Sequence, residues 1–434
     1  MSVSSQKKLS LVSAIFINLN VMIGTGIFIN TFDLSTKVGV LGCLLYPIVG
    51  IFMLPLIAVF GQLLAYYPTG GLYAFGKSSS SFLGFLSCWS YFFGKLASCS
   101  VMLFVGATML QQLIPLLHSY NPIYLSITIL ALFTCLNLLD MKTGIFVQSF
   151  FLTSKSIPIL FAIVAGIMLF DTSGITFNQS LFQSITGNIP LVLYCLAGFE
   201  TACALSRNIE NPAVNGPKAV YYSFGLIMLL YGIFQGLIYI SIHSSLEQIH
   251  SYQDIFPTIA YRLINSPVIA QKMAFLLNFA IGSSALGGAY GILFSNSWNL
   301  YTLAENNHLI GSSKFTQLNT HNTPWVAVLF QAFVCMTFLL CNQASVLPLR
   351  RTAALGIVIA YTISAFAYYQ LLQRKKTSHN SKLIAIAAFI TCMLFVANCI
   401  SSFMEEGIRP LFLFIAIISC GIIMFYYQEK IKQG

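Results

Sequence analysis

The sequence predicts an all-α polytopic membrane protein, and three observations support this fold class. Of its 434 residues, 57% are hydrophobic and only 7% are charged, whereas soluble globular domains carry about 25% charged residues. The mean hydropathy is +0.82. The apolar residues gather in runs of about 20, the length that a helix needs to cross a bilayer. The basic residues behind the net charge of +10 are dispersed over short segments, so they do not indicate a nucleic-acid-binding face.

Twelve apolar runs predict twelve transmembrane helices in a single domain that covers residues 1–434. The runs cover residues 9–32, 40–66, 82–116, 122–139, 144–170, 185–206, 219–242, 273–303, 325–340, 354–372, 383–403 and 410–427. The ninth and tenth runs are the least distinct, because the segment between them is only mildly polar. Residues 1–10 are polar and lead directly into the first full-length run. This pattern is not that of a cleavable signal peptide, so we expect the first helix to stay in the protein.

The basic residues predict the orientation of the chain. With the N-terminus in the cytoplasm, thirteen Lys and Arg residues fall in cytoplasmic segments and six in outer segments. Cytoplasmic loops carry an excess of Lys and Arg, so both termini are expected in the cytoplasm. Arg350 and Arg351 lie in an outer segment and go against this rule. The outer segment 243–271 contains Pro257 and Pro267, and we expect either short helices or a plain connector there.

The sequence indicates no metal site, no cofactor and no enzyme. All eleven cysteines fall in apolar runs, without a C-x-x-C pair or a histidine at ligand spacing. They are therefore expected to act as small buried apolar residues. The chain contains no H-E-x-x-H and no G-x-S-x-G motif, so metal-dependent and nucleophilic catalysis lack their residues.

Two interruptions of the apolar runs indicate where a ligand binds. In the run 9–32, Gly24 and Gly26 flank Thr25. In the run 185–206, residues 196–201 read Leu-Ala-Gly-Phe-Glu-Thr and bring the carboxylate of Glu200 into the membrane. Backbone groups freed by a helix break are tolerated at this depth only where they line a cavity or bind something. Paired breaks in the two halves of a chain are typical of a transporter's substrate site, so we expect a small solute to bind between them.

Three charged residues, Lys95, Lys155 and Glu200, lie too deep in the apolar runs to belong to loops. Each lysine is about 16 Å from the cytoplasmic start of its helix, at 1.5 Å per residue. A charge at such a depth costs at least about 2.5–3.5 kcal/mol and usually marks a substrate or proton path. Lys95 either contacts the substrate or forms a buried ion pair with Glu200. Lys155 either couples transport to protons or donates to the carbonyls freed at the first break, and Glu200 either serves proton linkage or gating, or caps the helix after the second break.

Four motifs resemble those of the amino acid/polyamine/organocation (APC) permease superfamily. They are Gly24-Thr25-Gly26 with Ile27 and Phe28; Pro68-Thr69-Gly70-Gly71-Leu72-Tyr73 with Gly84-Phe85 and Trp89; Gly198-Phe199-Glu200 with Glu210-Asn211-Pro212 and Pro217; and residues 300–305 with Thr323-Pro324. The resemblance covers nearly the whole chain. It implies amino acid transport in a bacterial cytoplasmic (inner) membrane by a monomer or a homodimer.

The resemblance also implies a LeuT-like fold, which is a 5+5 inverted repeat with broken helices 1 and 6. The first repeat would cover residues 9–170, the second residues 185–372, and two peripheral helices residues 383–427. In such proteins, backbone N–H groups at the first break hold the substrate's carboxylate, and carbonyls at both breaks hold its amino group. Half-helix N-termini attract anions and half-helix C-termini attract cations, so one pair of broken helices recognises a zwitterion.

Carried over to this chain, the resemblance implies one substrate site and a separate coupling pair. The substrate-binding residues would be Met22, Ile23, Gly24, Thr25, Gly26, Ile27, Lys95, Tyr194, Ala197 and Gly198. The N–H groups of Thr25, Gly26 and Ile27 would hold the carboxylate, and the carbonyls of Met22 or Ile23 and of Ala197 or Gly198 would hold the amino group. Tyr194 matches an aromatic gate, with a plain interior aromatic as the alternative. Lys155 and Glu200 would serve coupling and gating, and Lys155 matches a lysine whose ammonium takes the place of a sodium ion.

Two residues depart from the family pattern. Trp298 stands where many members have arginine, which leaves the cytoplasmic closing contacts open. Lys95 stands where other members carry a small or neutral residue in the side-chain pocket. Because like charges repel strongly in a pocket of low dielectric constant, we expect a neutral or acidic substrate in preference to a basic one.

The sequence therefore predicts a secondary active transporter of amino acids that works by alternating access and is either coupled to protons or an exchanger. Its partners would be an amino acid, protons and the lipid bilayer, without nucleic acid. Two alternatives stay open. The first is a membrane sensor that binds an amino acid without moving it, and the second is an exchanger of basic amino acids or polyamines.

Overall fold

The structure is a computed structural model that describes residues 8–171, 181–341, 346–375, 379–406 and 409–433. These residues form helices joined by loops, with one isolated β-bridge between Leu9 and Ile209. The helices are α1 (Leu11–Met22), α2 (Gly26–Lys37), η1 (Gly39–Leu41), α3 (Gly42–Tyr66), α4 (Gly71–Lys77), α5 (Ser81–Leu113), η2 (Pro115–Leu117), α6 (Pro122–Asn137), α7 (Met141–Met168), α8 (Leu181–Leu196), α9 (Thr201–Ala204), η3 (Ser206–Asn208), α10 (Pro212–Ile242), η4 (His243–Gln248), α11 (Tyr252–Leu263), α12 (Pro267–Glu305), α13 (Ser312–Phe315), α14 (Trp325–Cys341), α15 (Val346–Arg374), α16 (His379–Glu406) and α17 (Arg409–Gln433).

The apolar runs predict twelve membrane spans, but fewer helices are both strongly apolar and at least 18 residues long. Among the described residues, eight helices are long and apolar enough to cross a bilayer, and α1 with α2 forms a ninth if this bent pair counts as one span. Helices α6 and α14 are apolar but have fewer than 18 residues. The run 185–206 corresponds to α8 and the very short α9. An α-helical polytopic membrane protein is therefore confirmed, whereas twelve spans and an inverted repeat stay predictions.

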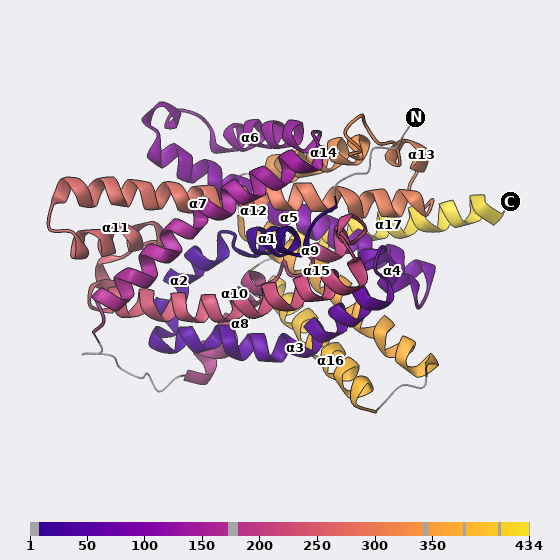
Figure 1. Ribbon diagram of the computed structural model, residues 1–434, viewed down its shortest axis with the longest axis horizontal. Coiled ribbons are helices and arrows are strands. Elements are labelled where there is room, and N and C mark those ends of the chain that lie inside the picture. The colour runs from indigo at the N-terminus through magenta and orange to yellow at the C-terminus, as the bar shows by residue number, and fades with distance from the viewer. Residues whose placement is uncertain (1–7, 172–180, 342–345, 376–378, 407–408, 434) are drawn as a thin grey trace.

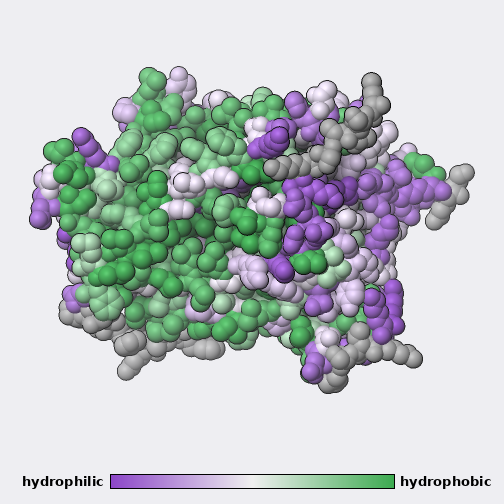
Figure 2. All heavy atoms as spheres, viewed as in Figure 1, coloured by the Kyte–Doolittle hydropathy of each residue, from purple (hydrophilic) through white to green (hydrophobic). Residues whose placement is uncertain are grey.

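The long helices lie side by side, and most of them run along the longest axis of the molecule (Figure 1). The first described residues, which pair with Ile209, and the end of α17 lie at one end of this bundle, together with α4 and α13, and α11 lies at the opposite end. On the face shown in Figure 2, hydrophobic side chains cover most of the surface, and hydrophilic ones gather at the end that carries the termini. Large apolar side chains such as Phe146 and Leu160 of α7 are exposed. Such a surface fits a lipid environment, since soluble proteins rarely expose apolar patches of this size.

The centre of the bundle is built from α5, α12 and α15. Within an apolar stretch of 18 residues, 83% of α12 and 78% of α5 is buried inside the protein, whereas only 17% of α17 is buried. Small residues allow the central helices to approach closely. A Cβ added to Gly356 of α15 would lie 2.6 Å from the carbonyl oxygen of Ser90 on α5. The two helices therefore pack closely at this point.

Polar side chains cap the N-termini of several helices, and short helices form within the segment 243–271, for which the sequence left two alternatives open. The side chains of Ser10, Asn121 and Asp140 accept hydrogen bonds from the first turns of α1, α6 and α7, as N-cap residues do. Within 243–271, the structure has η4 and α11 in place of a plain connector. A capping box of Ser251 and Asp254 begins α11.

None of the eleven cysteines forms a disulfide, but the prediction that all are buried is wrong for three of them. Cys135, Cys341 and Cys420 are exposed. They lie on α6, α14 and α17, on the outside of the bundle, where an apolar thiol is as compatible with lipid as with the core. In the part of the chain that the structure describes, no three His, Cys, Asp or Glu side chains are grouped so that they could hold a metal ion.

Candidate functional site

The first predicted break is present in the structure. Helix α1 ends at Met22, α2 begins at Gly26, and the two helices bend by 46° at the break. The two glycines permit close approaches on both sides of the bend. A Cβ added to Gly24 would lie 2.7 Å from the Cε of Met102, and a Cβ added to Gly26 would lie 2.5 Å from the Sγ of Cys195. Any larger residue would therefore collide with α5 or α8 unless those side chains moved.

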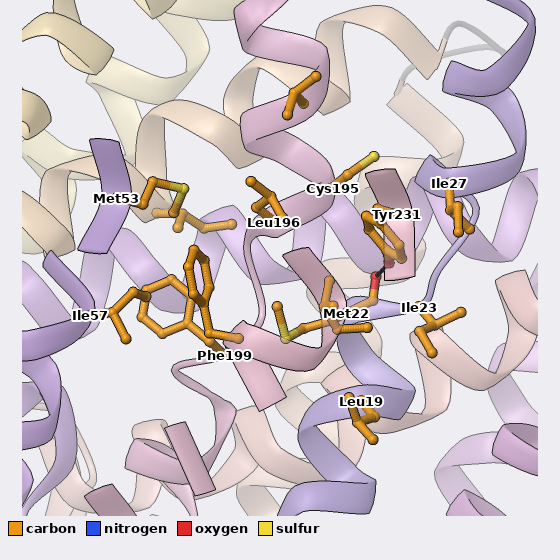
Figure 3. Close-up of a cluster of buried hydrophobic side chains, with 14 of the residues drawn as sticks. Leu19, Met22, Ile23, Ile27, Met53, Ile57, Cys195, Leu196, Phe199 and Tyr231 are labelled. Atoms are coloured by element: carbon orange, nitrogen blue, oxygen red, sulfur yellow. Dashed lines mark hydrogen bonds between the residues drawn. The ribbon is translucent and has the colours of Figure 1, made fainter. Parts of the chain in front are cut away.

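The second predicted break lies directly against the first. Helix α8 ends at Leu196 and α9 begins at Thr201. Between them, Gly198 has a φ of +120°, and a Cβ there would lie 2.9 Å from the Cγ of Met22. Such a backbone conformation strongly favours glycine. Figure 3 shows Met22, the last residue of α1, facing the segment that carries Leu196 and Phe199.

Asn18 on α1 joins the two breaks through hydrogen bonds. Its Nδ2 donates to the carbonyl of Phe199 at 2.9 Å, and its Oδ1 accepts from the N–H of Ala202 at 2.8 Å. The side chain is fully buried. It therefore satisfies two backbone groups that the second break releases, as buried backbone groups require. Sequence reasoning did not single out Asn18, although a buried asparagine in an apolar run is itself a signal of such a role.

The carbonyls freed at the first break are occupied by side chains from three other helices. The Nζ of Lys155 on α7 donates to the carbonyls of Asn20, at 2.8 Å, and Ile23. Ser284 on α12 donates to the carbonyl of Ile23 at 3.1 Å, and Tyr231 on α10 donates to that of Met22 at 2.8 Å (Figure 3). Lys155 therefore makes the contacts expected of a structural cation, which donates to the backbone carbonyls freed at the first break.

The carbonyls at the end of α1 need hydrogen-bond donors, whereas the N–H groups at the start of α2 need acceptors. Phe28 is the first residue there whose N–H bonds to the new helix, to the carbonyl of Thr25 at 3.2 Å. Among the described residues, the N–H groups of Thr25, Gly26 and Ile27 make no such bond, and the buried hydroxyl of Thr25 also has no hydrogen-bond partner. Unpaired N–H groups at a helix N-terminus attract anions.

A narrow cavity lies between the two breaks. It is lined by Val21, Met22, Gly24, Gly26, Lys95, Ser98, Met102, Tyr194, Cys195, Ala197, Ile292 and Ile357. Its volume is about 20 Å³, which is room for about one water molecule. An amino acid can enter only if the surrounding side chains or helices move apart.

Six of the ten predicted substrate-binding residues line this cavity: Met22, Gly24, Gly26, Lys95, Tyr194 and Ala197. The other four, Ile23, Thr25, Ile27 and Gly198, are their neighbours in the chain and do not line it. Sequence reasoning missed Ser98 and Met102, which follow Lys95 at helical spacings of three and seven residues and could have been found from that pattern. Ile292 and Ile357 are ordinary apolar residues of helices distant in sequence, and nothing in the sequence distinguishes them.

Lys95 and Glu200 form a buried ion pair at the wall of this cavity. The Nζ of Lys95 lies 2.7 Å from Oε1 of Glu200. Glu200 is fully buried and also accepts hydrogen bonds from Tyr91 at 2.9 Å, from Tyr361 at 2.6 Å and from the N–H of Gly198 at 2.8 Å. Its side chain makes no capping bond to α9. The carboxylate thus links α5 and α15 to the second break, and the pair has no net charge.

Tyr194 lies at another wall of the cavity. Its hydroxyl is 3.0 Å from the Oγ of Ser98 on α5, and the guanidinium of Arg350 lies 5.4 Å from the centre of its ring. The tyrosine is only partly buried. It therefore stands between the cavity and Arg350 of α15.

At the end of the bundle that carries the termini, side-chain contacts join η3 to α12. Arg207 forms an ion pair with Glu305 at 2.9 Å and lies over the ring of Tyr301 at 5.2 Å. Trp298 packs edge-on against Tyr301, with 5.6 Å between ring centres. Trp298, which stands where the resemblance would lead one to expect arginine, therefore packs beside the ion pair of Arg207 and Glu305.

Comparison with known proteins gives the family for nearly the whole length of the chain. The family model described as amino acid permease matches residues 9–427. This chain belongs to the amino acid permease family. The permease is 25% identical to the serine/threonine exchanger SteT of Bacillus subtilis, over 99% of its own length and 98% of that protein. It is 25% identical to the serine permease SerP1 of Lactococcus lactis, over 82% of each chain, and 24% identical to the amino-acid permease AapA of Bacillus subtilis, over 87% and 86%.

The family membership confirms the resemblance to APC permeases that the four motifs indicate. The permease is an integral membrane protein that transports amino acids and is not an enzyme. The two breaks, the cavity and the buried ion pair are the parts of its structure from which a mechanism can be argued.

Proposed function

We propose that the permease is a secondary active transporter of small neutral amino acids, which bind between the two helix breaks and cross the membrane by alternating access. The observation that carries the proposal is the meeting of the start of α2 and the end of α8 at one cavity, which Gly26 and Ala197 both line. The start of a helix offers N–H groups to a carboxylate, and the end of a helix offers carbonyls to an ammonium. A zwitterion matches both.

The free backbone groups support a division of roles between the breaks. The N–H groups of Thr25, Gly26 and Ile27 would hold the carboxylate. The carbonyl of Ile23 already accepts from both Lys155 and Ser284, and that of Met22 accepts from Tyr231. The carbonyls of Ala197 and Gly198 at the second break are therefore the better acceptors for the substrate's ammonium.

The ion pair supports a neutral substrate. Lys95 alone would repel cations, but its charge is balanced by Glu200 at 2.7 Å, so the wall offers no free counter-charge to an acidic side chain either. The cavity of about 20 Å³ has to widen for any amino acid, and a small side chain requires the least change. The names of two relatives, a serine/threonine exchanger and a serine permease, support the same size class.

Alternating access would open the cavity to one side at a time. We propose that Tyr194 is the gate on the side of α11, and that Arg207 with Glu305 and Tyr301 closes the side of the termini. The excess of Lys and Arg in segments on the side of the termini supports a cytoplasmic location for both termini. The gate at Tyr194 would then face the outside of the cell.

Lys155 is the proposed site of coupling to protons. Its ammonium donates to two carbonyls at the first break, and no described residue forms an ion pair with it. Loss of its proton would remove the charge that stabilises these carbonyls, so the first break would change its hydrogen bonding when the proton leaves. Glu200 would act as a gating residue, because it joins the second break to α5 and α15.

Uptake into proteoliposomes tests the proposal. The purified permease should take up labelled L-serine, and the uptake should rise when a pH gradient is imposed or when the vesicles are preloaded with unlabelled serine. Unlabelled alanine, serine and threonine should compete better than lysine, arginine or putrescine. Binding of serine without uptake or counterflow would instead favour a sensor, and competition by arginine or putrescine alone would favour the exchanger of basic substrates.

A further inference from the structure

Arg350, in the second turn of α15, has a buried donor group without a partner. Its Nη2 is buried and makes no hydrogen bond to any described residue. Its guanidinium lies over the ring of Tyr194, 5.4 Å from the ring centre. In the described part of the chain, no carboxylate forms an ion pair with it. A buried charged donor that lacks an acceptor destabilises the protein, so its presence calls for a reason.

Two other cations near the transport path are neutralised by carboxylates, whereas Lys155 donates to backbone carbonyls. Lys95 is paired with Glu200 at 2.7 Å, and Arg207 with Glu305 at 2.9 Å. Arg350 therefore differs from them in carrying a positive charge that the described residues do not balance. It is also only partly buried, as is Tyr194 beside it, so a solute can reach the pair.

The position of Arg350 on α15 places it on the substrate's path. Residues 350, 357 and 361 follow at helical spacings of seven and four, so they share one face of the helix. Ile357 lines the central cavity, and Tyr361 donates to Glu200. Seven residues of helix correspond to about 10 Å, which is two turns from the cavity towards the end of the bundle opposite the termini.

We propose that Arg350 binds the carboxylate of the incoming amino acid at an outer subsite, which Tyr194 separates from the central cavity. The inference rests on the proposed transport of amino acids and adds a second, earlier contact to it. A guanidinium offers two parallel N–H groups that match a carboxylate, and the free Nη2 supplies one of them. Because the same guanidinium lies on the Tyr194 ring, its engagement by a carboxylate weakens the contact that keeps the gate closed.

This role predicts an unusual effect of Arg350→Gln on stability. Replacement of an arginine with a structural role would lower the melting temperature. Removal of an unpartnered buried charge should instead leave the melting temperature of the ligand-free protein unchanged or raise it. A ligand that binds the folded state stabilises it in proportion to its affinity. The rise in melting temperature on adding serine should therefore be smaller in Arg350→Gln than in the wild type.

Transport gives a second, independent readout. In proteoliposomes with right-side-out permease, Arg350→Gln and Arg350→Lys should raise the KM for external serine at least tenfold, with less than a twofold change in kcat. The KM for serine leaving from the termini side should stay the same. The matched control is Arg351→Gln, because Arg351 lies over the ring of Phe403 at 5.9 Å and not over Tyr194, and its KM should equal that of the wild type.

The outcomes separate this inference from the proposed function. If the wild type takes up no amino acid, the proposed function fails and the subsite fails with it. If the wild type transports serine but Arg350→Gln and Arg351→Gln have the same external KM, only the subsite is refuted. A lowered melting temperature of ligand-free Arg350→Gln would assign the arginine a structural role. If replacing chloride by gluconate lowers the melting temperature of the wild type but not of Arg350→Gln, an inorganic anion occupies the site and the inference is overturned.

Discussion

The buried ion pair leads to a prediction about stability that can be worked from its hydrogen bonds. Glu200 accepts four hydrogen bonds, from Lys95, Tyr91, Tyr361 and the N–H of Gly198. In Glu200→Gln, one carboxylate oxygen becomes an NH₂ group that faces donors, and Lys95 is left charged without a counter-charge. Breaking a buried pair in this way costs about 3–5 kcal/mol. Glu200→Gln should therefore be among the most destabilising single substitutions in the permease.

Replacing the other partner should cost less. In Lys95→Met, the carboxylate of Glu200 keeps three of its four donors, so the loss is that of one charged hydrogen bond, about 1.5–3 kcal/mol. The double variant Lys95→Met/Glu200→Gln has no charge at either position of the pair. We expect it to be no less stable than Glu200→Gln alone, with a coupling energy of up to about 3 kcal/mol between the two sites.

The assay is equilibrium unfolding in mixed detergent micelles, followed by circular dichroism for the wild type, both single variants and the double variant. Lys77→Met is the matched control, because Lys77 is an exposed lysine with a hydrogen bond to Asn306. Its replacement should change the free energy of unfolding by less than about 0.5 kcal/mol. The reasoning would be refuted if Lys95→Met destabilised the permease as much as Glu200→Gln, or if the two effects were additive in the double variant.

Three further predictions concern the first break and the end of the bundle that carries the termini. Lys155→Met should cost about 1.5–3 kcal/mol of stability and abolish the stimulation of serine uptake by a pH gradient; undiminished stimulation would exclude Lys155 from coupling. Gly26→Ala should reduce uptake at least tenfold, because its Cβ would lie 2.5 Å from the Sγ of Cys195, and Gly26→Ala/Cys195→Ala should restore part of the activity; equal loss in both variants would contradict the steric explanation. Burial and the nearby Lys432 lower the pKa of His308 from 6.5 to about 4. The unfolded chain therefore binds the histidine's proton more tightly than the folded protein does. The contribution of neutral His308 to the free energy of unfolding is complete above about pH 6.5 and is lost as the pH falls towards 4. His308→Gln should have a shallower fall of melting temperature over that interval, and parallel curves for both proteins would contradict this role.

The apolar runs and the two glycine-containing interruptions were sufficient to predict the fold class and the location of both breaks. The physical reason is local. A bilayer requires long apolar helices, and Gly24, Gly26 and Gly198 interrupt these helices where they stand. The identity of the family followed from motifs that the chain carries in order, and the match over residues 9–427 confirms it.

Contacts between distant residues were decided only by the tertiary structure. The sequence could place Lys95 and Glu200 at similar depths, but two roles stayed open for Lys95 because a pairing across 105 positions depends on how α5 packs against the second break. Asn18 is marked in the sequence only as a polar residue in an apolar run, and its partners at the second break depend on the fold. Ile357, which lines the cavity from α15, had no local signal for the same reason. Arg350 looked in the sequence only like an exception to the distribution of basic residues. Its unpartnered nitrogen and its contact with Tyr194 exist because α8 and α15, separated by 150 residues of chain, pack together in the folded bundle.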